Sequence, residues 1–125
     1  MAYINIARVF IAAHPDVAEC AVLGVADKLK GQIPIGFIVL KDGTKKAPTD
    51  IETECVQLIR RKIGAVASLK IVMQVDRLPK TRSGKILRGT IRKIVDGADW
   101  KIPATIDDPL ILDEIALVLK SRGLI

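Results

Sequence analysis

The fold is decided by the segment Val17–Val25, which reads VAECAVLGV. Its side chains are apolar on both faces except at Glu19, and several are β-branched, a pattern typical of a buried strand. A second apolar run of strand length, Ile35–Leu40, follows a polar turn over residues 27–32 and ends in a turn signal at residues 41–43. The two runs predict two strands of one small sheet.

Helices are predicted on either side of these strands. The apolar segment Ile4–Ala13 predicts a helix that stops before Pro15, because a proline disfavours the helical conformation of the residue that precedes it. Residues 50–63 predict an amphipathic helix, and Thr49 followed by Glu52 fits a capping box at its start. The apolar side chains of this helix recur at i, i+4, i+7 and i+8: Ile51, Cys55, Leu58 and Ile59.

The second half of the chain predicts one more strand and two more helices. The alternation over residues 70–76, with Val72 as the exception, predicts a half-buried strand, and a loop follows over residues 77–84. Helices are predicted over residues 87–95 and 111–119. Strands mixed with helices, without a regular βαβ alternation, indicate the α+β class. Three strands do not form a stable sheet alone in water, so we expect a small mixed sheet with one face covered by helices.

Length and composition indicate a single small domain over residues 1–125. Half of the residues are hydrophobic and 3% are aromatic, so the core must be aliphatic. No apolar run approaches the roughly 18 to 20 residues that span a bilayer. The N-terminus also lacks a basic region followed by a long apolar block. We therefore expect no membrane partner and no secretory signal, and a cytoplasmic location with the mitochondrial matrix as the alternative.

The cysteine and histidine content does not predict a metal site. Cys20 and Cys55 lie within apolar patterns, where a free cysteine behaves as a small hydrophobic residue, so each is expected to be a buried reduced thiol. The chain has one histidine and no CxxC motif, which excludes the usual zinc constellations. His14, beside Pro15 and without a nucleophile context, is expected to have a structural or surface role.

The positive charge is concentrated in one stretch. The formal net charge is +6, yet residues 60–93 contain eleven lysines and arginines and a single acid, Asp76. The rest of the chain is therefore acidic on balance. A local basic surface predicts an anionic ligand more than a uniformly adhesive protein.

The loop before the helix predicted over residues 87–95 contains the residue types that suit an anion site. Gly84 permits unusual dihedrals and close backbone approach, and Thr81 or Ser83 could cap the helix or contact a ligand. Lys85, with Arg88 and Arg92 at i+3 and i+7, would extend a positive stripe along one helix face. With the N-terminal N–H groups of the helix, these cations could hold a carboxylate and the phosphates of a nucleotide.

This loop has two other interpretations. From charge and spacing alone, a solvated basic face beside a turn is the plain alternative. A Walker A loop is excluded, because that motif needs a glycine where Pro79 stands and a serine or threonine where Ile86 stands.

Residues 79–88, PKTRSGKILR, closely resemble the final motif of acetyl- and propionyl-CoA synthetases in the adenylate-forming superfamily. The order of several other segments is also similar to that family. These segments are His14–Val25, Lys30–Gln32, Arg60–Gly64 and Thr105–Pro109, the last being similar to the tail of propionyl-CoA synthetases. The resemblance runs from about His14 to the end of the chain, and it implies the C-terminal domain of the adenylate-forming fold.

The resemblance implies an AMP-forming acyl-CoA synthetase, an acid–thiol ligase. This family makes acyl-AMP from a carboxylate and Mg-ATP and then exchanges AMP for coenzyme A. Lys85 matches the lysine that bridges carboxylate and phosphate, and that a lysine acetyltransferase and a deacylase switch off and on. Arg60 matches an arginine that meets the coenzyme A phosphates. Four further motif residues are expected to bind substrate or cofactor: Arg82, Ser83, Gly84 and Arg88.

The chain also departs from the family pattern. The large N-terminal adenylation domain, with its nucleotide loop and acyl pocket, is not part of these 125 residues. Residues 1–13 match the family's hinge region poorly, and Gly89 stands where a second arginine often follows Arg88. The fragment alone is therefore expected to be inactive, and the sequence does not decide between acetate and propionate.

The competing interpretation is a free-standing relic that binds a nucleotide, coenzyme A or a protein partner without catalysis. A nucleic-acid partner is not expected, because the basic stretch lacks the interleaved aromatic residues that stack bases and shows no helix-turn-helix or RRM signature. Dependence of a reaction on Lys85 would distinguish the synthetase domain from the binding module.

Overall fold

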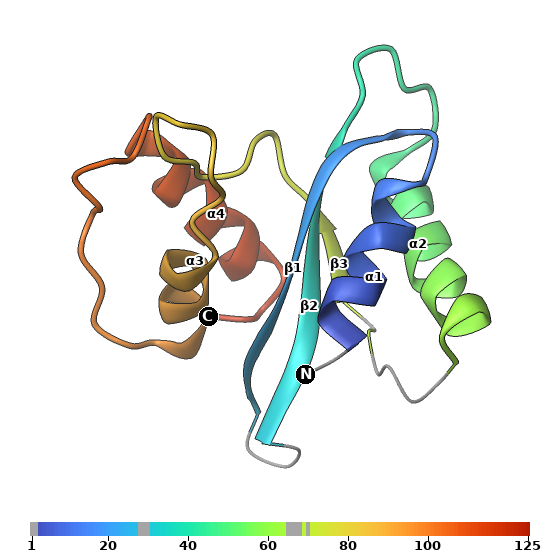
Figure 1. The fold of residues 1–125 in the computed structure, drawn as a ribbon, viewed down its shortest axis with the longest axis horizontal. Helices are drawn as coiled ribbons and strands as arrows, with labels where there is room; N and C mark the ends of the chain where they lie inside the picture. The colour runs from blue at the N-terminus through green and yellow to red at the C-terminus, as the bar shows by residue number, and fades with distance from the viewer. Residues whose placement is uncertain (1–2, 28–30, 65–68, 70) are drawn as a thin grey trace. The chain divides into compact units, whose positions relative to one another are not determined.

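The computed structural model describes residues 3–27, 31–64, 69 and 71–125 (Figure 1). The chain divides into two compact units, Met1–Asp76 and Arg77–Ile125. The first unit contains a sheet with two helices and the second contains two further helices. Strands and helices are mixed along the chain without a regular alternation, which confirms the predicted α+β class.

The sheet of the first unit has three strands in the order β1-β2-β3. β1 (Val17–Asp27) pairs antiparallel with β2 (Gly31–Leu40), and β2 pairs parallel with β3 (Ile71–Gln74). The predicted small mixed sheet is therefore confirmed. The strands are longer than the sequence predicted, because residues 26 and 27 pair with residues 32 and 31 instead of forming part of a turn.

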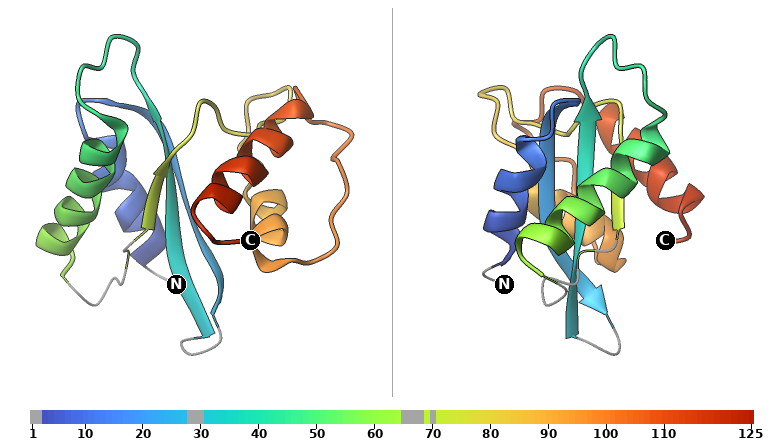
Figure 2. Two further views of the ribbon diagram at one scale, coloured as in Figure 1. Left: turned by 180° about the vertical axis from the view of Figure 1, so that it is seen from behind. Right: turned by 90° about the vertical axis from the view of Figure 1, so that its right-hand side faces the viewer.

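Two helices cover one face of this sheet. α1 (Tyr3–Ala12) packs against β1, and α2 (Pro48–Lys62) packs against β3 and α1, so both lie on the same side (Figure 2). The core beneath them is aliphatic, as predicted, and includes Ile11, Val22, Ile38, Ile51 and Ile59. Burial of each such side chain contributes about 1.5–3 kcal/mol. Cys20 and Cys55 belong to the same core as free thiols, and burial raises the pKa of Cys55 to about 12.

The predicted third strand is confirmed as β3, at the edge of the sheet beside β2. Ile71 and Gln74 are half-buried, whereas Val72 and Met73, which point to opposite faces, are buried, so Val72 is the exception to the predicted alternation. The N–H of Val75 extends the pairing of β3 by donating to the carbonyl of Ile38 at 2.8 Å. Lys70 of the predicted alternation and Lys30 of the second matching segment lie outside the described residues.

The capping box predicted at Thr49 was wrong. α2 begins at Pro48 with Ala47 as its N-cap, and no side chain caps it. Proline suits the first turn of a helix, because its fixed φ is helical and the first N–H groups have no helical partner. Glu52 is instead 7% exposed, and its carboxylate accepts a hydrogen bond from the backbone N–H of Gln74 at 2.8 Å. This bond ties α2 to the last residue of β3.

Replacement of Glu52 should therefore weaken the first unit. Glu52→Ala removes the acceptor of the half-buried Gln74 N–H, so we expect the free energy of unfolding to fall by about 1–3 kcal/mol in urea denaturation. Glu52→Gln, the matched control, keeps a carbonyl acceptor and should lose less. Equal losses for the two variants would show that the acceptor is not the source of the stability.

The second unit has two short helices around a small apolar contact. α3 (Arg88–Asp96) and α4 (Leu110–Ser121) pack on each other, and their buried side chains are Ile91, Ile94, Ile111, Leu112, Ile115 and Leu119. α3 ends at Gly97, whose φ of 69° is left-handed, and the Ala98 N–H bonds the Lys93 carbonyl at 3.0 Å. Both predicted helices are confirmed. Lys85 lies in the loop that precedes α3.

Candidate functional site

Lys85 lies directly after a tight turn in the second unit. The turn spans Thr81 to Gly84, and the N–H of Gly84 donates to the carbonyl of Thr81 at 2.9 Å. Gly84 has φ +92°, a conformation that favours glycine, while a Cβ at this position would meet no atom within 4 Å. Glycine is thus required here by the backbone conformation and not by a lack of space.

Residues 79–87, which we call the lysine loop, form a small hairpin around this turn. The N–H of Thr81 donates to the carbonyl of Lys85 at 2.8 Å, and the N–H of Leu87 donates to the carbonyl of Pro79 at 2.9 Å. Lys80 and Ile86 form the bridge between the two arms. The backbone on both sides of the turn is therefore fixed by its own hydrogen bonds.

The side chain of Thr81 strengthens the same turn. Its hydroxyl accepts a hydrogen bond from the backbone N–H of Lys85 at 3.1 Å and lies 3.0 Å from the hydroxyl of Ser83. Of the two roles that the sequence allowed for Thr81 and Ser83, helix capping is excluded, because α3 starts at Arg88 with Leu87 as N-cap and without a side-chain cap. Residues 85–87 form the second arm of the hairpin, so the helix begins only at Arg88.

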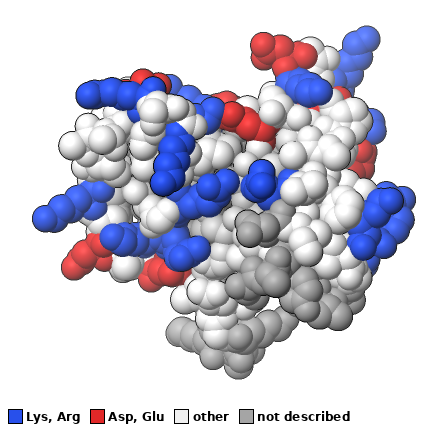
Figure 3. Space-filling model, viewed as in Figure 1, with Lys and Arg blue, Asp and Glu red and all other residues white. Residues whose placement is uncertain are grey.

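Lys85 consequently precedes α3 by three residues and does not belong to a helical stripe with Arg88 and Arg92, as the sequence had predicted. Arg82, Ser83, Gly84 and Lys85 are exposed on the loop, and Arg88 is half-buried at the helix start. Within the part of the chain that the structure describes, no carboxylate forms an ion pair with Arg82, Lys85 or Arg88. Their charge is therefore available to an anionic ligand. Figure 3 shows lysine and arginine side chains on the surface of the second unit.

A segment near the end of the chain supports the lysine loop. The N–H of Arg82 donates to the carbonyl of Thr105 at 3.0 Å, and the N–H of Asp107 donates to the carbonyl of Lys80 at 2.9 Å. Between them, Thr81 forms a bridge with Ile106, whose side chain is buried. Residues 105–107, the tail segment, thus add a third arm to the hairpin.

Arg77, the first residue of the second unit, forms a bidentate ion pair. Its Nε and Nη2 donate to the two carboxylate oxygens of Glu114 at 3.1 and 2.6 Å, and its Nη1 donates to Asp108 at 2.9 Å. The hydrogen bond from Arg77 holds the pKa of Glu114 below its ordinary value. The backbone N–H of Leu110 and then Arg77 lower the pKa of Asp108. The start of the loop is therefore tied to the start of α4 by charge-assisted bonds, which sequence reasoning missed.

These shifts predict a pH-dependent contribution to stability. Because both carboxyl groups have a lowered pKa in the folded protein, their contribution is complete above the unfolded value of about 4 and is lost as the pH falls through the folded pKa. Glu114→Gln should lower the free energy of unfolding at pH 7 and have a smaller effect at an acid pH below the folded pKa of Glu114, where the carboxyl is protonated. Urea denaturation at both pH values measures this, with Asp113→Asn on the same helix as control. Equal effects of Glu114→Gln at the two pH values would contradict the assignment.

The chain is similar to known proteins of one family. Residues 9–85 match the family model described as "AMP-binding enzyme C-terminal domain". The chain belongs to this family. The match ends on Lys85 itself, so it includes the turn of the lysine loop.

The relatives of this AMP-binding C-terminal domain are much longer proteins. An uncharacterized Pseudomonas aeruginosa protein is 54% identical over 112 residues, covering 90% of this chain and 18% of its own length. A Dictyostelium discoideum protein named "Acyl-CoA synthetase short-chain family member B, mitochondrial" is 49% identical over 102 residues, covering 82% of this chain and 15% of its own. The crystal structure of Brucella canis acyl-CoA synthetase has a TM-score of 0.62 at 33% identity, over 70% of this chain and 16% of that one. The chain thus spans less than a fifth of the curated relatives it matches.

Arg60, the predicted coenzyme A residue, is exposed on α2. It therefore belongs to the first unit of this AMP-binding C-terminal domain, whereas the lysine loop belongs to the second. No group of three or more His, Cys, Asp or Glu side chains among the described residues could hold a metal ion. In the same residues, no helix has the length and apolar character needed to cross a bilayer.

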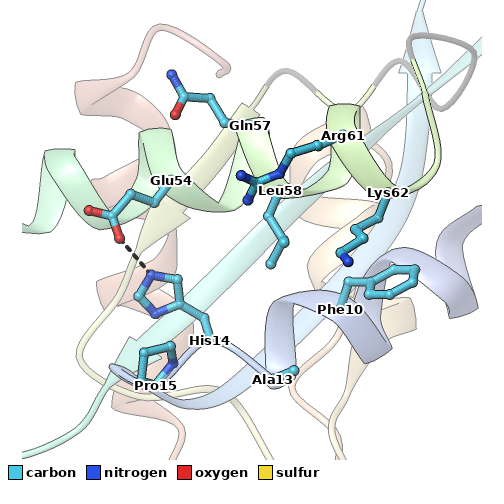
Figure 4. A pocket seen from close by; sticks show the side chains of 9 residues that line it. All are labelled: Phe10, Ala13, His14, Pro15, Glu54, Gln57, Leu58, Arg61 and Lys62. Carbon is cyan, nitrogen blue, oxygen red and sulfur yellow. Dashed lines mark hydrogen bonds and ion pairs between the residues drawn. The ribbon is translucent and has the colours of Figure 1, made fainter.

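The first unit also has a pocket of about 530 Å³ between the end of α1 and one face of α2 (Figure 4). Phe10, Pro15 and Leu58 supply apolar walls, and Arg61 and Lys62 add two exposed cations. Arg60 does not line this pocket.

His14, at one side of the pocket, has a structural role, in agreement with the sequence. Its Nδ1 accepts the backbone N–H of Asp16 at 3.0 Å, so the hydrogen lies on Nε2, which donates to Glu54 at 2.9 Å. The His14 bond and the ion pair with Lys46 hold the pKa of Glu54 below its ordinary value. Both ring nitrogens are thereby bonded to groups of the first unit, which supports the structural role.

Proposed function

We propose that this chain is the small C-terminal domain of an AMP-forming short-chain acyl-CoA synthetase, acting on acetate or propionate, in which Lys85 serves acyl-adenylate formation. The observation that carries the proposal is an exposed lysine on a hydrogen-bonded hairpin within the motif of residues 79–88. Membership of the AMP-binding C-terminal family and the names of several relatives support the reaction class.

The first half-reaction joins two anions, so it needs positive charge. A carboxylate oxygen attacks the α-phosphorus of ATP, the bond to the bridging oxygen breaks, and acyl-AMP and pyrophosphate form. The ammonium group of Lys85 would lie between carboxylate and phosphate and offset the charge that develops there. One such donor is typically worth about 3–4 kcal/mol, a factor of about a hundred to a thousand in rate.

The neighbouring motif residues would bind the phosphate-bearing substrates. Arg82 and Arg88 offer guanidinium groups, and Ser83 and Gly84 offer a hydroxyl and an exposed backbone. Arg60 would meet the phosphates of coenzyme A in the second half-reaction, when AMP is exchanged for the thiol. Mg²⁺ would enter with ATP and depend on the rest of the enzyme, because the described residues contain no carboxylate cluster for it.

The proposed partners follow from this role. The relatives are more than five times as long as the matched region, which supports a large N-terminal adenylation domain as the main partner. A lysine acetyltransferase and a deacylase would regulate the enzyme at Lys85, because acetylation removes the charge that adenylation needs. The enzyme would work in the cytoplasm, with the mitochondrial matrix as the alternative.

Reconstitution tests the proposal. The chain is mixed with a large adenylating domain that lacks its own small domain, together with propionate or acetate and Mg-ATP, and pyrophosphate release is followed. We expect the natural chain to support pyrophosphate release. In Lys85→Ala the rate should fall about a hundred- to a thousandfold, because the positive charge that stabilises the transition state is removed. Lys93→Ala, an exposed lysine of α3, is the matched control and should keep full activity.

The same experiment addresses the second candidate, a binding module without catalysis, which the pocket beside Arg61 and Lys62 favours. The small domain native to the large partner, added separately, provides the positive control. Activity with the native domain and none with this chain would contradict the synthetase role and support the binding module.

A further inference from the structure

The backbone of Lys85 is held on both sides by a single residue. Its N–H donates to the hydroxyl of Thr81 at 3.1 Å, and its carbonyl accepts the N–H of Thr81 at 2.8 Å. The carbonyl of Thr81 also accepts the N–H of Gly84, the residue just before Lys85, at 2.9 Å. Thr81 thus directs its N–H, its carbonyl and its side chain to the turn that presents Lys85.

Thr81 is itself fixed by the tail segment. The hydrogen bonds from Arg82 to Thr105 and from Asp107 to Lys80 flank it on both sides, and the buried Ile106 pairs with it. This segment lies about twenty residues after the last position of the family match, residue 85. The support of the lysine loop is therefore contributed by chain outside the matched region.

We propose that Thr81 is a positioning residue for Lys85, and that the tail segment holds Thr81 in place for this purpose. The inference rests on the proposed function of Lys85 in adenylation. The exposed lysine side chain has several rotatable bonds, so the accuracy with which its ammonium group is presented depends on a fixed backbone at its base. A displacement of about 1 Å in such a group can cost about a hundredfold in rate. The role of Thr81 is to remove backbone freedom at Lys85 before substrates bind.

The hydroxyl of Thr81 can be tested separately from its shape. Thr81→Val keeps the branched side chain and the backbone bonds but removes the acceptor for the Lys85 N–H, whereas Thr81→Ser keeps the acceptor. In the reconstituted reaction we expect Thr81→Val to lower pyrophosphate release about ten- to a hundredfold and Thr81→Ser to stay within about threefold of the natural chain.

A double variant distinguishes positioning from a general structural effect. If Thr81 acts through Lys85, adding Thr81→Val to Lys85→Ala should cause no further loss, because the group that is positioned is already absent. An additional loss of the same size as in the single variant would overturn the proposal.

Amide hydrogen exchange of the chain alone gives a readout that does not depend on the proposed function. In Thr81→Val the Lys85 amide should exchange about tenfold faster or more, while Thr81→Ser leaves it protected. The amide of Ile91, which bonds Leu87 at 3.2 Å in α3, reports whether the unit remains folded. If Thr81→Val does not fold, Thr81→Ala provides the same comparison.

The two readouts separate the two claims. Equal Lys85 exchange in the natural chain, Thr81→Val and Thr81→Ser would overturn the positioning role, whatever the activity. Altered exchange with no pyrophosphate release by the natural chain would instead contradict the proposed function and with it the purpose assigned to Thr81.

Discussion

The structure of the first unit depends on the burial of one face of a three-stranded sheet. Three strands alone leave too much apolar surface and too many unpaired backbone groups in water. α1 and α2 remove that surface, and the carboxylate of Glu52 joins α2 to β3 by a bond to the backbone of Gln74. With few aromatic residues, the core relies on many aliphatic side chains, each contributing a modest amount.

The second unit differs from the first, because its exposed Lys85 lies on a hairpin whose backbone is fixed by hydrogen bonds. Its apolar contact between α3 and α4 is small, and the loop before α3 is ordered mainly by hydrogen bonds. The hairpin around Thr81, the tail segment and the ion pairs of Arg77 all act on residues 77–87. The backbone of this loop is therefore ordered by bonds within the chain itself.

Much of this architecture could be predicted from the sequence, because it is encoded in local patterns. The periodicity of α1 and α2 and the β-branched runs of β1 and β2 identified these elements, and the motif around Lys85 identified the candidate site. The failures lie where a residue bonds to a distant one. Arg77 pairs with residues 31 and 37 positions away, and no local pattern signals such a pair. Glu52 fitted a capping box, but the helix begins earlier, at Pro48. The Glu52 carboxylate therefore accepts a hydrogen bond from β3 instead of capping α2.

The central claim is that Lys85 serves adenylation and not thioester formation, and the two half-reactions can be measured separately. The chain carrying Lys85→Ala is combined with the large adenylating domain and supplied either with propionate and Mg-ATP or with preformed propionyl-AMP and coenzyme A. The account predicts that pyrophosphate release is lost in the first assay, while propionyl-CoA forms at the rate of the natural chain in the second. Equal loss in both assays would contradict the role assigned to Lys85, because a general defect in binding or folding would then explain its effect.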